Sequence, residues 1–489
     1  MTLGALMTIN DFEVLKPYTL LTVWACILLL VDLFIPKGRK GITALLSALG
    51  LAITLGFTLA QIGTERSGFS GMVVLDGFST FVNALLLVSG LLGVALAYGY
   101  IKRMNIERGE YYTLLLFSIT GMMLMAQASD LIVVFIALEL LSIPLYVLAA
   151  FNRSRSESEE AGLKYFLLGA FATGFVVYGT ALVFGATGYT NLTAIVAYAS
   201  TGTSGLLLTI GAALILVGFG FKIAAVPFHM WTPDVYQGAP SAVTAFMSSG
   251  AKIAGFAALL RVFATAFPTL AADMTDVLWA LAASTMILGN VIAISQTNIK
   301  RLLAYSSIAH AGYILMAFVP YGNPAVRDVS IAAGLFYLVS YAVTNFGAWS
   351  VVIALEKAEG KGLEIADYAG LGRKYPAIAA AMTVFMLSLI GFPPTLGMVG
   401  KFYLFRSVIA GGYTWLAIIG VLTSVVSVYF YLRVVVQMYM TPASAPMALP
   451  PVPAFAGAAL VVSAIIVFYL GVLPTQVMTW ASASIGTIF

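Results

Sequence analysis

The sequence predicts an all-α polytopic membrane protein with about fourteen transmembrane helices. Of the 489 residues, 61% are hydrophobic and only 9% are charged, whereas soluble domains are about 25% charged. The apolar runs are long and continuous, unlike the alternating strands of outer-membrane barrels. A helix needs roughly 20 apolar residues to cross a bilayer, so the chain is long enough for about a dozen or more spans.

Apolar runs between charged clusters give the expected spans in order. They cover residues 18–36, 41–62, 77–101, 111–128, 131–151, 160–186, 205–237, 239–265, 277–297, 299–320, 329–356, 375–409, 413–440 and 452–473. The seventh and twelfth runs are too long for one simple span and contain interior proline, Pro227 in the first and Pro393-Pro394 in the second. Because proline removes a helical hydrogen bond, we expect a broken helix in each run.

The Lys and Arg residues of the expected loops gather on one side of the membrane. That side holds Lys37, Arg39, Lys40, Lys102, Arg103, Arg108, Arg153, Arg155, Lys300, Arg301, Lys357, Lys361, Arg373 and Lys374, whereas the other side has only Lys16, Arg66 and Arg327. Because cytoplasmic loops carry the excess of basic residues, we expect this side to be cytoplasmic. Both termini are then expected outside, on the periplasmic side.

Two short motifs recur at the same offset in the sequence. Gly162-Leu163-x-Tyr165 returns as Gly334-Leu335-x-Tyr337, and Leu260-Arg261-Val262 returns as Leu432-Arg433-Val434. The offset shifts the chain by five spans, an odd number, so the two units have opposite orientations. We therefore expect two inverted five-helix repeats, each with a broken helix, as is typical of ion-translocating proteins. The expected regions are 1–110 (three helices), 111–265 (spans four to eight), 277–440 (spans nine to thirteen) and 441–489 (the last helix).

A few ionisable residues are expected at membrane depth, where a charge is costly and marks an ion path by default. The basic ones are Lys164, Lys222, Lys252, Arg261, Lys401, Arg406 and Arg433, and the acid well inside a span is Glu139. Structural alternatives remain open for them. Glu139 and Lys164 can form a purely structural ion pair, and Lys164 can snorkel to the interface, which is the favoured interpretation for the three arginines. Lys222 can bind carbonyls at a helix end, and Lys401, about two turns after the second break, can have a purely structural role.

The counts of cysteine and histidine limit the possible cofactors. The chain has one cysteine, Cys26, and two histidines, His229 and His310. A disulfide, a Cys-ligated zinc or iron–sulfur site and a pair of bis-histidine haems are therefore excluded within this chain, and we expect no metal or cofactor site. His310 suits proton exchange near neutral pH, with a hydrogen-bonded core histidine as the alternative. The net charge of +4 does not predict nucleic-acid binding, because basic residues are expected at membrane ends.

Three segments resemble the antiporter-like membrane subunits of respiratory complex I, and the resemblance extends over nearly the whole chain. They are Asp130-Leu131 with Ala137-Leu138-Glu139-Leu140-Leu141-Ser142, the seventh-span motif at residues 218–240, and the segment from Asn298-Ile299-Lys300-Arg301 to Ala309-His310. Lys401 stands where M-type subunits of this family carry glutamate, which is similar to the N-type. A multi-subunit sodium/proton antiporter and a photosynthetic complex I-like enzyme are the alternative settings.

The resemblance implies a proton-translocating subunit of an NADH-quinone oxidoreductase in the bacterial inner membrane. Glu139 and Lys164 would form a charge-switch pair beside a proton relay. The residues implied for the whole relay are Glu139, Lys164, Lys222, Lys252, His310 and Lys401, with His229 and Lys300 as further candidates. NADH, FMN, iron–sulfur clusters and quinone would belong to partner subunits, and the neighbours would be the M-type subunit and small membrane subunits. A purely structural subunit would instead tolerate neutral substitutions of these lysines.

Overall fold

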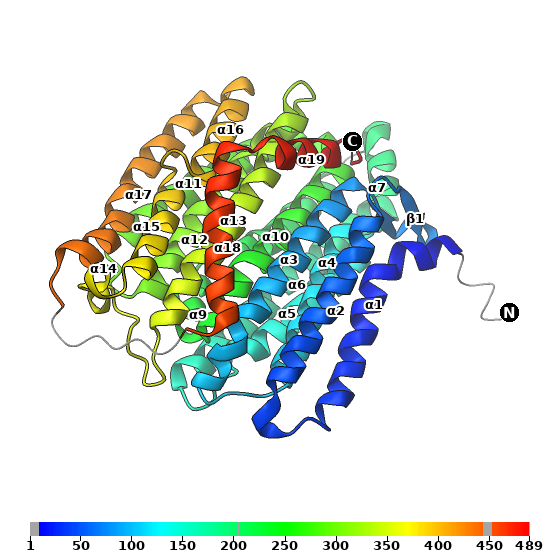
Figure 1. Cartoon of the computed structure of the whole chain (residues 1–489). Coiled ribbons are helices and arrows are strands. Elements are labelled where there is room, and N and C mark those ends of the chain that lie inside the picture. The colour runs from blue at the N-terminus through cyan, green and yellow to red at the C-terminus, as the bar shows by residue number, and fades with distance from the viewer. Residues whose placement is uncertain (1–8, 204, 444–451, 489) are drawn as a thin grey trace.

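A computed structural model gives the fold and describes residues 9–203, 205–443 and 452–488. Figure 1 shows long helices packed side by side in one bundle. The α-helices are α1 (Ile9–Asp32), α2 (Gly41–Ala60), α3 (Gly77–Arg103), α4 (Glu110–Gln127), α5 (Leu131–Ala149), α6 (Ser156–Thr187), α7 (Leu192–Tyr198), α8 (Leu206–Ile223), α9 (Trp231–Gly238), α10 (Ser241–Ala266), α11 (Ala271–Ala293), α12 (Ile299–Met316), α13 (Arg327–Leu355), α14 (Leu371–Lys374), α15 (Pro376–Ile390), α16 (Leu396–Ala410), α17 (Thr414–Met440), α18 (Ala454–Val472) and α19 (Thr475–Ile485).

Short elements complete the described chain. Strands β1 (Arg66–Gly68) and β2 (Val73–Leu75) pair antiparallel between α2 and α3. The 3-10 helices are η2 (Lys37–Arg39), η3 (Phe69–Gly71), η5 (Pro268–Leu270), η6 (Val319–Gly322) and η7 (Ile365–Tyr368), and the π-helical turn is η4 (Ala199–Thr203).

The chain is a multi-pass membrane protein with an all-α fold, as the composition predicts. In the described ranges, twelve helices are long and apolar enough to cross a membrane. These twelve leave out α4 and the interrupted segment of α15 and α16, which are the other two spans expected from the sequence. The total of fourteen therefore stays a prediction.

Both long apolar runs are interrupted where their prolines lie. Helix α8 ends at Ile223, the next residue Ala224 is a non-glycine residue in the left-handed region (φ 62°), and α9 begins only at Trp231. Helix α15 ends at Ile390, the next residue Gly391 is also left-handed (φ 90°), and α16 begins after Thr395. Each break leaves the last backbone carbonyls of a helix without partners in their own helix.

Two isolated antiparallel bridges hold equivalent loops in the two expected repeats. Asp130, just before α5, pairs with Asn191 after α6, while Asn298, just before α12, pairs with Glu364 after α13. Each bridge lies beside a short helix, α7 for the first and α14 for the second, and Figure 1 places these helices at opposite ends of the bundle. The inverted orientation of the two units stays a prediction from the sequence motifs.

Two arginines of the recurring Leu-Arg-Val motif make matching contacts. Arg261 on α10 donates to the carbonyl of Ala126 near the end of α4 (2.9 Å), and Arg433 on α17 donates to the carbonyl of Ile294 after α11 (2.9 Å). Arg261 also forms a bidentate pair with Asp76 at 2.5 and 2.9 Å. Arg261 is therefore buried and paired, which makes snorkelling the wrong expectation for it: the carboxylate at the start of α3 supplies its counter-charge inside the bundle.

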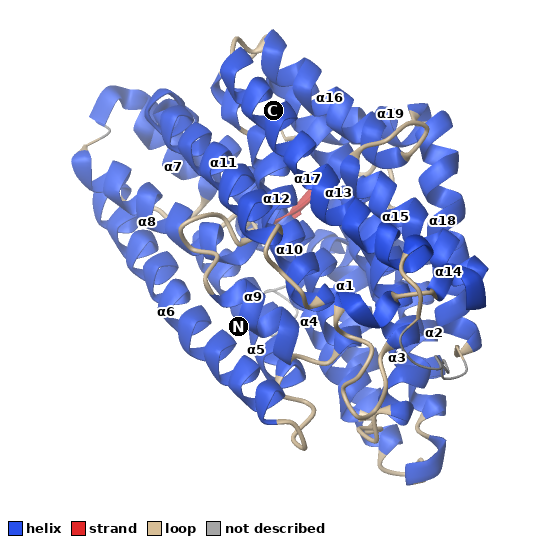
Figure 2. Cartoon of the chain, turned by 90° about the vertical axis from the view of Figure 1, so that its left-hand side faces the viewer, coloured by secondary structure: helices blue, strands red, loops and turns tan. Residues whose placement is uncertain are grey.

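Helices α10 and α12 form the centre of the molecule. All residues in the apolar windows of these two helices are buried, whereas α18 has only 28% of its window buried. Helix α18 packs on α13 and α3, and α19 lies across the end of the bundle. Figure 2 shows α6 and α8 along one edge and α18 along the other. Lys252 and Arg261 on α10 and His310 on α12 are thus enclosed by protein.

Candidate proton pathway

Lys222 lies in the last turn of α8, directly before the break. Its side chain is buried, and its Nζ donates to Ser142 Oγ on α5 at 2.7 Å. The ammonium also lies 5.7 Å from the ring centre of Tyr165 on α6. The stem of Lys222 passes close to Gly255, where an added Cβ would lie 3.4 Å from its Cγ. Lys222 therefore reaches α10 one helical turn from Lys252.

Lys252 occupies the middle of α10 and is 1% exposed. Its Nζ donates to the backbone carbonyl of Ser307 on α12, and the ammonium lies 5.8 Å from the ring centre of Tyr341 on α13. The Tyr341 hydroxyl donates to Ser307 Oγ at 2.8 Å. The lysine is thus held by neutral oxygen and aromatic groups.

His310 lies three residues after Ser307 and connects three helices. Its Nδ1 is 2.8 Å from the Tyr337 hydroxyl on α13, and its Nε2 is 3.2 Å from the Tyr431 hydroxyl on α17. Tyr431 also hydrogen-bonds Ser306. The Tyr341 ring lies 5.4 Å from the imidazole and 5.8 Å from the Lys252 ammonium, and the Tyr313 ring lies 5.7 Å from the imidazole and 4.8 Å from the Lys401 ammonium. His310 therefore lies between the two lysines with a hydroxyl at each ring nitrogen, an arrangement able to accept and donate a proton.

Lys401 lies on α16, opposite the end of α15. Its Nζ donates to the carbonyls of Leu389 (3.1 Å) and Ile390 (2.8 Å) and to Ser424 Oγ on α17 (2.6 Å). These carbonyls belong to the C-terminal end of α15, where a helix carries partial negative charge. Gly391 permits this approach, because a Cβ there would lie 2.9 Å from Lys401 Cδ.

The expected ion pair between Glu139 and Lys164 is wrong for this structure: no contact joins them in the described part of the chain. Glu139 accepts a hydrogen bond from Thr173 on α6 at 2.7 Å. Lys164 pairs instead with Glu160, one turn earlier on α6 (2.5 Å), and with Asp234 on α9 (2.8 Å). The physical reason is that α9 brings the Asp234 carboxylate to the half-exposed end of the Lys164 side chain.

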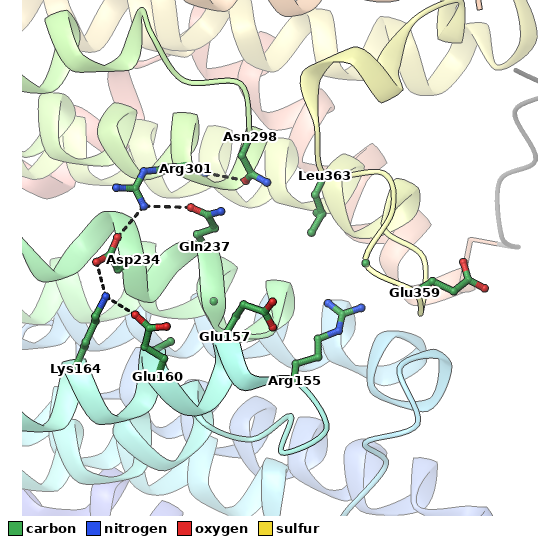
Figure 3. Close-up of a pocket in the computed structure, with 13 residues that line it drawn as sticks. Arg155, Glu157, Glu160, Lys164, Asp234, Gln237, Asn298, Arg301, Glu359 and Leu363 are labelled. Carbon is green, nitrogen blue, oxygen red and sulfur yellow. Dashed lines mark hydrogen bonds and ion pairs between the residues drawn. The ribbon is translucent and has the colours of Figure 1, made fainter. Parts of the chain in front are cut away.

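An open cavity of about 560 Å³ adjoins this ion pair. We call it the vestibule, and Figure 3 shows Lys164, Asp234 and Arg301 in one line along its wall. Arg301 donates to Asp234 Oδ1 at 2.7 Å, so this carboxylate is shared between α6 and α12. The lining residues are Arg155, Glu157, Glu160, Ala161, Lys164, Asp234, Gln237, Gly238, Asn298, Arg301, Glu359, Gly360 and Leu363.

The two further candidates lie outside the central row. Lys300 is 2% exposed although it begins α12, and its Nζ donates to the carbonyl of Ala239 at 2.6 Å. His229 lies in the loop between α8 and α9, and its buried Nδ1 has no hydrogen-bond partner among the described residues. Neither residue contacts Lys222, Lys252 or Lys401 in the described hydrogen bonds.

Sequence reasoning missed the hydroxyl groups and the carboxylate that position these residues. Asp234 and Tyr431 have no individual signal in the sequence, because the residue type alone does not reveal which acid or tyrosine is placed beside a buried group. A signal did exist for two tyrosines, since the recurring Gly-Leu-x-Tyr motif places Tyr165 beside Lys222 and Tyr337 beside His310.

Comparison with known families gives the assignment. The family model described as NADH:quinone oxidoreductase/Mrp antiporter, TM, matches residues 128–427. The chain belongs to this family. Within the NADH:quinone oxidoreductase/Mrp antiporter family, it is 49% identical over 484 residues to NADH-quinone oxidoreductase subunit N of Trichlorobacter lovleyi, covering 98% of both chains. It is 46% identical over 436 residues to the subunit N of Chloroflexus aggregans, covering 88% of both.

Two solved structures are similar to this chain along almost its full length. A chain of respiratory complex I from Thermus thermophilus with bound aureothin is 36% identical with a TM-score of 0.81, and the match covers 96% of this chain and 100% of that one. A chain of the Mrp complex from Dietzia sp. has a TM-score of 0.85 at 19% identity, covering 98% of this chain and 97% of that one. The second likeness shows the shared fold alone.

Proposed function

We propose that this chain is a proton-translocating, antiporter-like membrane subunit of an NADH-quinone oxidoreductase, the activity named for its curated relatives. One observation carries the proposal. Three lysines buried on α8, α10 and α16 form no ion pair with any described carboxylate, and neutral oxygens hold them instead. They are Lys222, Lys252 and Lys401.

Neutral partners suit a lysine that alternates between its charged and neutral forms. A carboxylate in direct contact would hold the ammonium form, whereas serine and tyrosine hydroxyls can both donate and accept hydrogen bonds. A permanent unpaired charge inside a membrane protein is costly. We assign Lys222, Lys252, His310 and Lys401 to one relay, in that order, because the imidazole of His310 is close to one tyrosine ring that Lys252 approaches and to another that Lys401 approaches.

Glu139 and Lys164 have the proposed role of a charge switch at one end of the relay. The Glu139 charge acts on Lys222, and Lys164 now lies with Asp234 in the vestibule. If Lys164 moves to Glu139, the field at Lys222 changes. A unit charge at about 4 Å contributes roughly 4 kcal/mol at an effective dielectric constant near 20, which is enough to drive proton transfer.

The proposal places the redox chemistry in partner subunits. NADH, FMN, iron–sulfur clusters and quinone would be bound there, and energy would reach this chain through contacts with an M-type subunit and small membrane subunits. The basic loops orient the vestibule toward the cytoplasm and both termini toward the periplasm of a bacterial inner membrane. Residues 111–265 and 277–440 would form the two inverted units, flanked by 1–110 and 441–489.

Substitution of the relay residues tests the function in the intact complex. Glu139→Gln and Lys222→Ala are expected to lower the number of protons pumped per NADH oxidised in membrane vesicles. Lys102→Ala removes an exposed lysine and is the matched control, expected to pump normally. Unchanged pumping in both relay variants with intact assembly would overturn the proposal and favour a purely structural subunit.

The second candidate is a subunit of a sodium/proton antiporter without redox partners. The matching family model favours it, because its description names the Mrp antiporter beside NADH:quinone oxidoreductase. Purification of the native complex separates the two functions: flavin and iron–sulfur absorbance in the purified complex supports the oxidoreductase, and their absence with sodium-driven proton exchange supports the antiporter.

A further inference from the structure

Ser424 on α17 lies between Lys401 and the end of α15. Its Oγ accepts a hydrogen bond from Lys401 Nζ at 2.6 Å and donates one to the carbonyl of Ile390 at 3.1 Å. The same carbonyl accepts a hydrogen bond from Lys401 Nζ at 2.8 Å. The lysine nitrogen, the hydroxyl and the carbonyl therefore form a triangle in which each pair of atoms is within hydrogen-bond distance.

The hydrogen bonds around Lys401 match its charged form. An ammonium has three N–H donors, and the described acceptors are also three: the carbonyls of Leu389 and Ile390 and the hydroxyl oxygen of Ser424. In this state the Ser424 hydroxyl donates its own proton to the carbonyl of Ile390. Each donor of the site then has an acceptor, although no described carboxylate contacts the lysine.

The same groups match the neutral form of Lys401 after one hydroxyl turns. A neutral amine has two N–H donors and one lone pair, and the two carbonyls can only accept from the N–H groups. Rotation about the Cβ–Oγ bond of Ser424 lets its O–H donate to the lone pair of Lys401 Nζ. The carbonyl of Ile390 keeps an N–H of Lys401 as its donor, so no buried polar group loses its last partner.

Lys222 has the same kind of partner at the other helix break. Its Nζ donates to Ser142 Oγ at 2.7 Å, and this hydroxyl donates to the carbonyl of Leu138, one turn earlier on α5. Because Leu138 precedes Ser142 by four residues in a helix, its carbonyl also accepts the backbone N–H of Ser142 and keeps that partner when the hydroxyl turns. The lysine at each break therefore contacts a serine hydroxyl that can reverse its direction.

We propose that Ser424 and Ser142 are positioning residues that hold Lys401 and Lys222 in place in both protonation states. The inference rests on the proposed function and adds two residues to it. Neither serine carries the proton. Each hydroxyl accepts from the ammonium, and it donates to the amine that remains after the relay has taken the proton. The lysine nitrogen keeps its position, so proton exchange requires the rotation of one hydroxyl instead of a movement of the lysine side chain.

The ionisable groups around Lys401 include no carboxylate among the described contacts. The ring centre of Tyr313 on α12 lies 4.8 Å from the ammonium, and the hydroxyl of this tyrosine faces Ser424. Helix α15 has no ionisable residue. Among the described hydrogen bonds, Ser424 thus supplies the hydroxyl in direct contact with the lysine nitrogen. The other ionisable groups on this side are His310 on α12, Tyr337 on α13, which lies against Gly400, and Tyr431 on α17.

Paired substitutions at Ser424 test the inference in the assembled complex. Ser424→Thr keeps the hydroxyl, whereas Ser424→Val has the shape of the threonine variant without it. We expect Ser424→Thr to pump normally and Ser424→Val to pump about tenfold more slowly at neutral pH, because the amine then has no donor for its lone pair. Ser427→Ala removes a buried hydroxyl that donates to the carbonyl of Ser424; it is the matched control and pumps normally. Equal pumping by the assembled Thr and Val variants overturns the inference.

The pH dependence of pumping separates a loss of the neutral form from general damage. Without the Ser424 hydroxyl, the two carbonyls still accept from the ammonium, but no described group donates to the amine. Ser424→Val should therefore release the proton of Lys401 only at higher pH, and the pumping profile should move up by about one pH unit. A uniform loss of pumping with an unshifted profile would make Ser424 a structural residue only and overturns the inference.

The same comparison at Ser142 decides if the Ser424 variants do not assemble. Normal pumping by Ser142→Thr with slower pumping by Ser142→Val supports the inference, and equal pumping by the two overturns it. Lys222→Ala and Lys401→Ala distinguish failure of the inference from failure of the function. If these lysine variants lose pumping while the Thr and Val variants pump alike, the relay stands and only the role of the serines is wrong. If none of these variants loses pumping, the function itself is wrong.

Discussion

Lys164 on α6 and Asp234 on α9 form an ion pair of 2.8 Å at the vestibule, and Asp234 is held at the same time by Arg301 at 2.7 Å. The lysine that the sequence places in a switch with Glu139 is therefore engaged by a different carboxylate. This alternative partner makes Asp234 a competitor of Glu139 for one ammonium, and the competition can be measured.

Asp234→Asn is expected to weaken the interaction of residue 234 with Lys164, so that the Lys164 side chain moves toward Glu139. Because the pair is partly exposed, its loss should cost at most about 1 kcal/mol of stability, whereas proton pumping should change clearly. Thermal unfolding and pumping per NADH measure the two effects. Asp328→Asn, at another exposed ion pair, is the control. A large stability loss without a change in pumping would make Asp234 a structural residue only.

Gly391→Ala should impair the site of Lys401 more than it impairs the fold. The added Cβ meets Lys401 Cδ at 2.9 Å, and the left-handed backbone (φ 90°) disfavours any side chain, at a cost of about 1–3 kcal/mol. Gly412→Ala is a matched control, because it has the same φ of 90° and nothing within 4 Å of its Cβ. Both variants should lose stability, and only Gly391→Ala should also lose pumping. If Gly391→Ala and Gly412→Ala pump protons equally well, Lys401 is not part of the relay.

Removal of one hydroxyl beside His310 should slow proton transfer without unfolding the protein. Tyr337→Phe leaves Nδ1 without its 2.8 Å partner, and an unsatisfied buried polar group costs about 1–3 kcal/mol. We expect reduced pumping and a larger solvent isotope effect on turnover. Tyr178→Phe, an exposed tyrosine on α6, should change neither quantity. An unaltered isotope effect in Tyr337→Phe would count against His310 as a proton carrier.

Arg261→Gln should strongly destabilise the protein. It leaves the buried Asp76 carboxylate without its bidentate partner, and breaking a buried pair costs about 3–5 kcal/mol. The double variant Asp76→Asn with Arg261→Gln should recover part of that loss, because no uncompensated charge remains. Arg327→Gln, at a more exposed pair, should cost less than about 1 kcal/mol. Unfolding in detergent micelles provides all three values.

The sequence was sufficient for the class of fold and for the position of both helix breaks. A continuous apolar run crosses a bilayer as a helix, because its backbone N–H and C=O groups must then form hydrogen bonds within the segment itself. Pro227 and Pro393-Pro394 then mark where two segments stop. The buried lysines could be found for the same reason, since charges are rare in apolar runs and each is easy to locate.

The partners of those lysines could not be predicted. Whether Lys164 meets Glu139 or Asp234 depends on how the chain returns after α8, and on which face α9 turns toward α6. These are tertiary relations that no local pattern encodes. The same holds for Arg261, whose partner Asp76 is far away in sequence, and for Ser424, whose contact with Lys401 depends on how α17 packs beside α16.

The apolar windows of α10 and α12 are enclosed by protein, so changes on the lipid-facing surface do not reach them directly. Lysines on these helices touch neither lipid nor solvent directly, so the annular lipids do not set their surroundings. Substitutions that adapt the outer surface of α18 to a thicker or thinner bilayer should therefore leave proton transfer unchanged. The lipid-facing shell and the conducting interior can be redesigned separately.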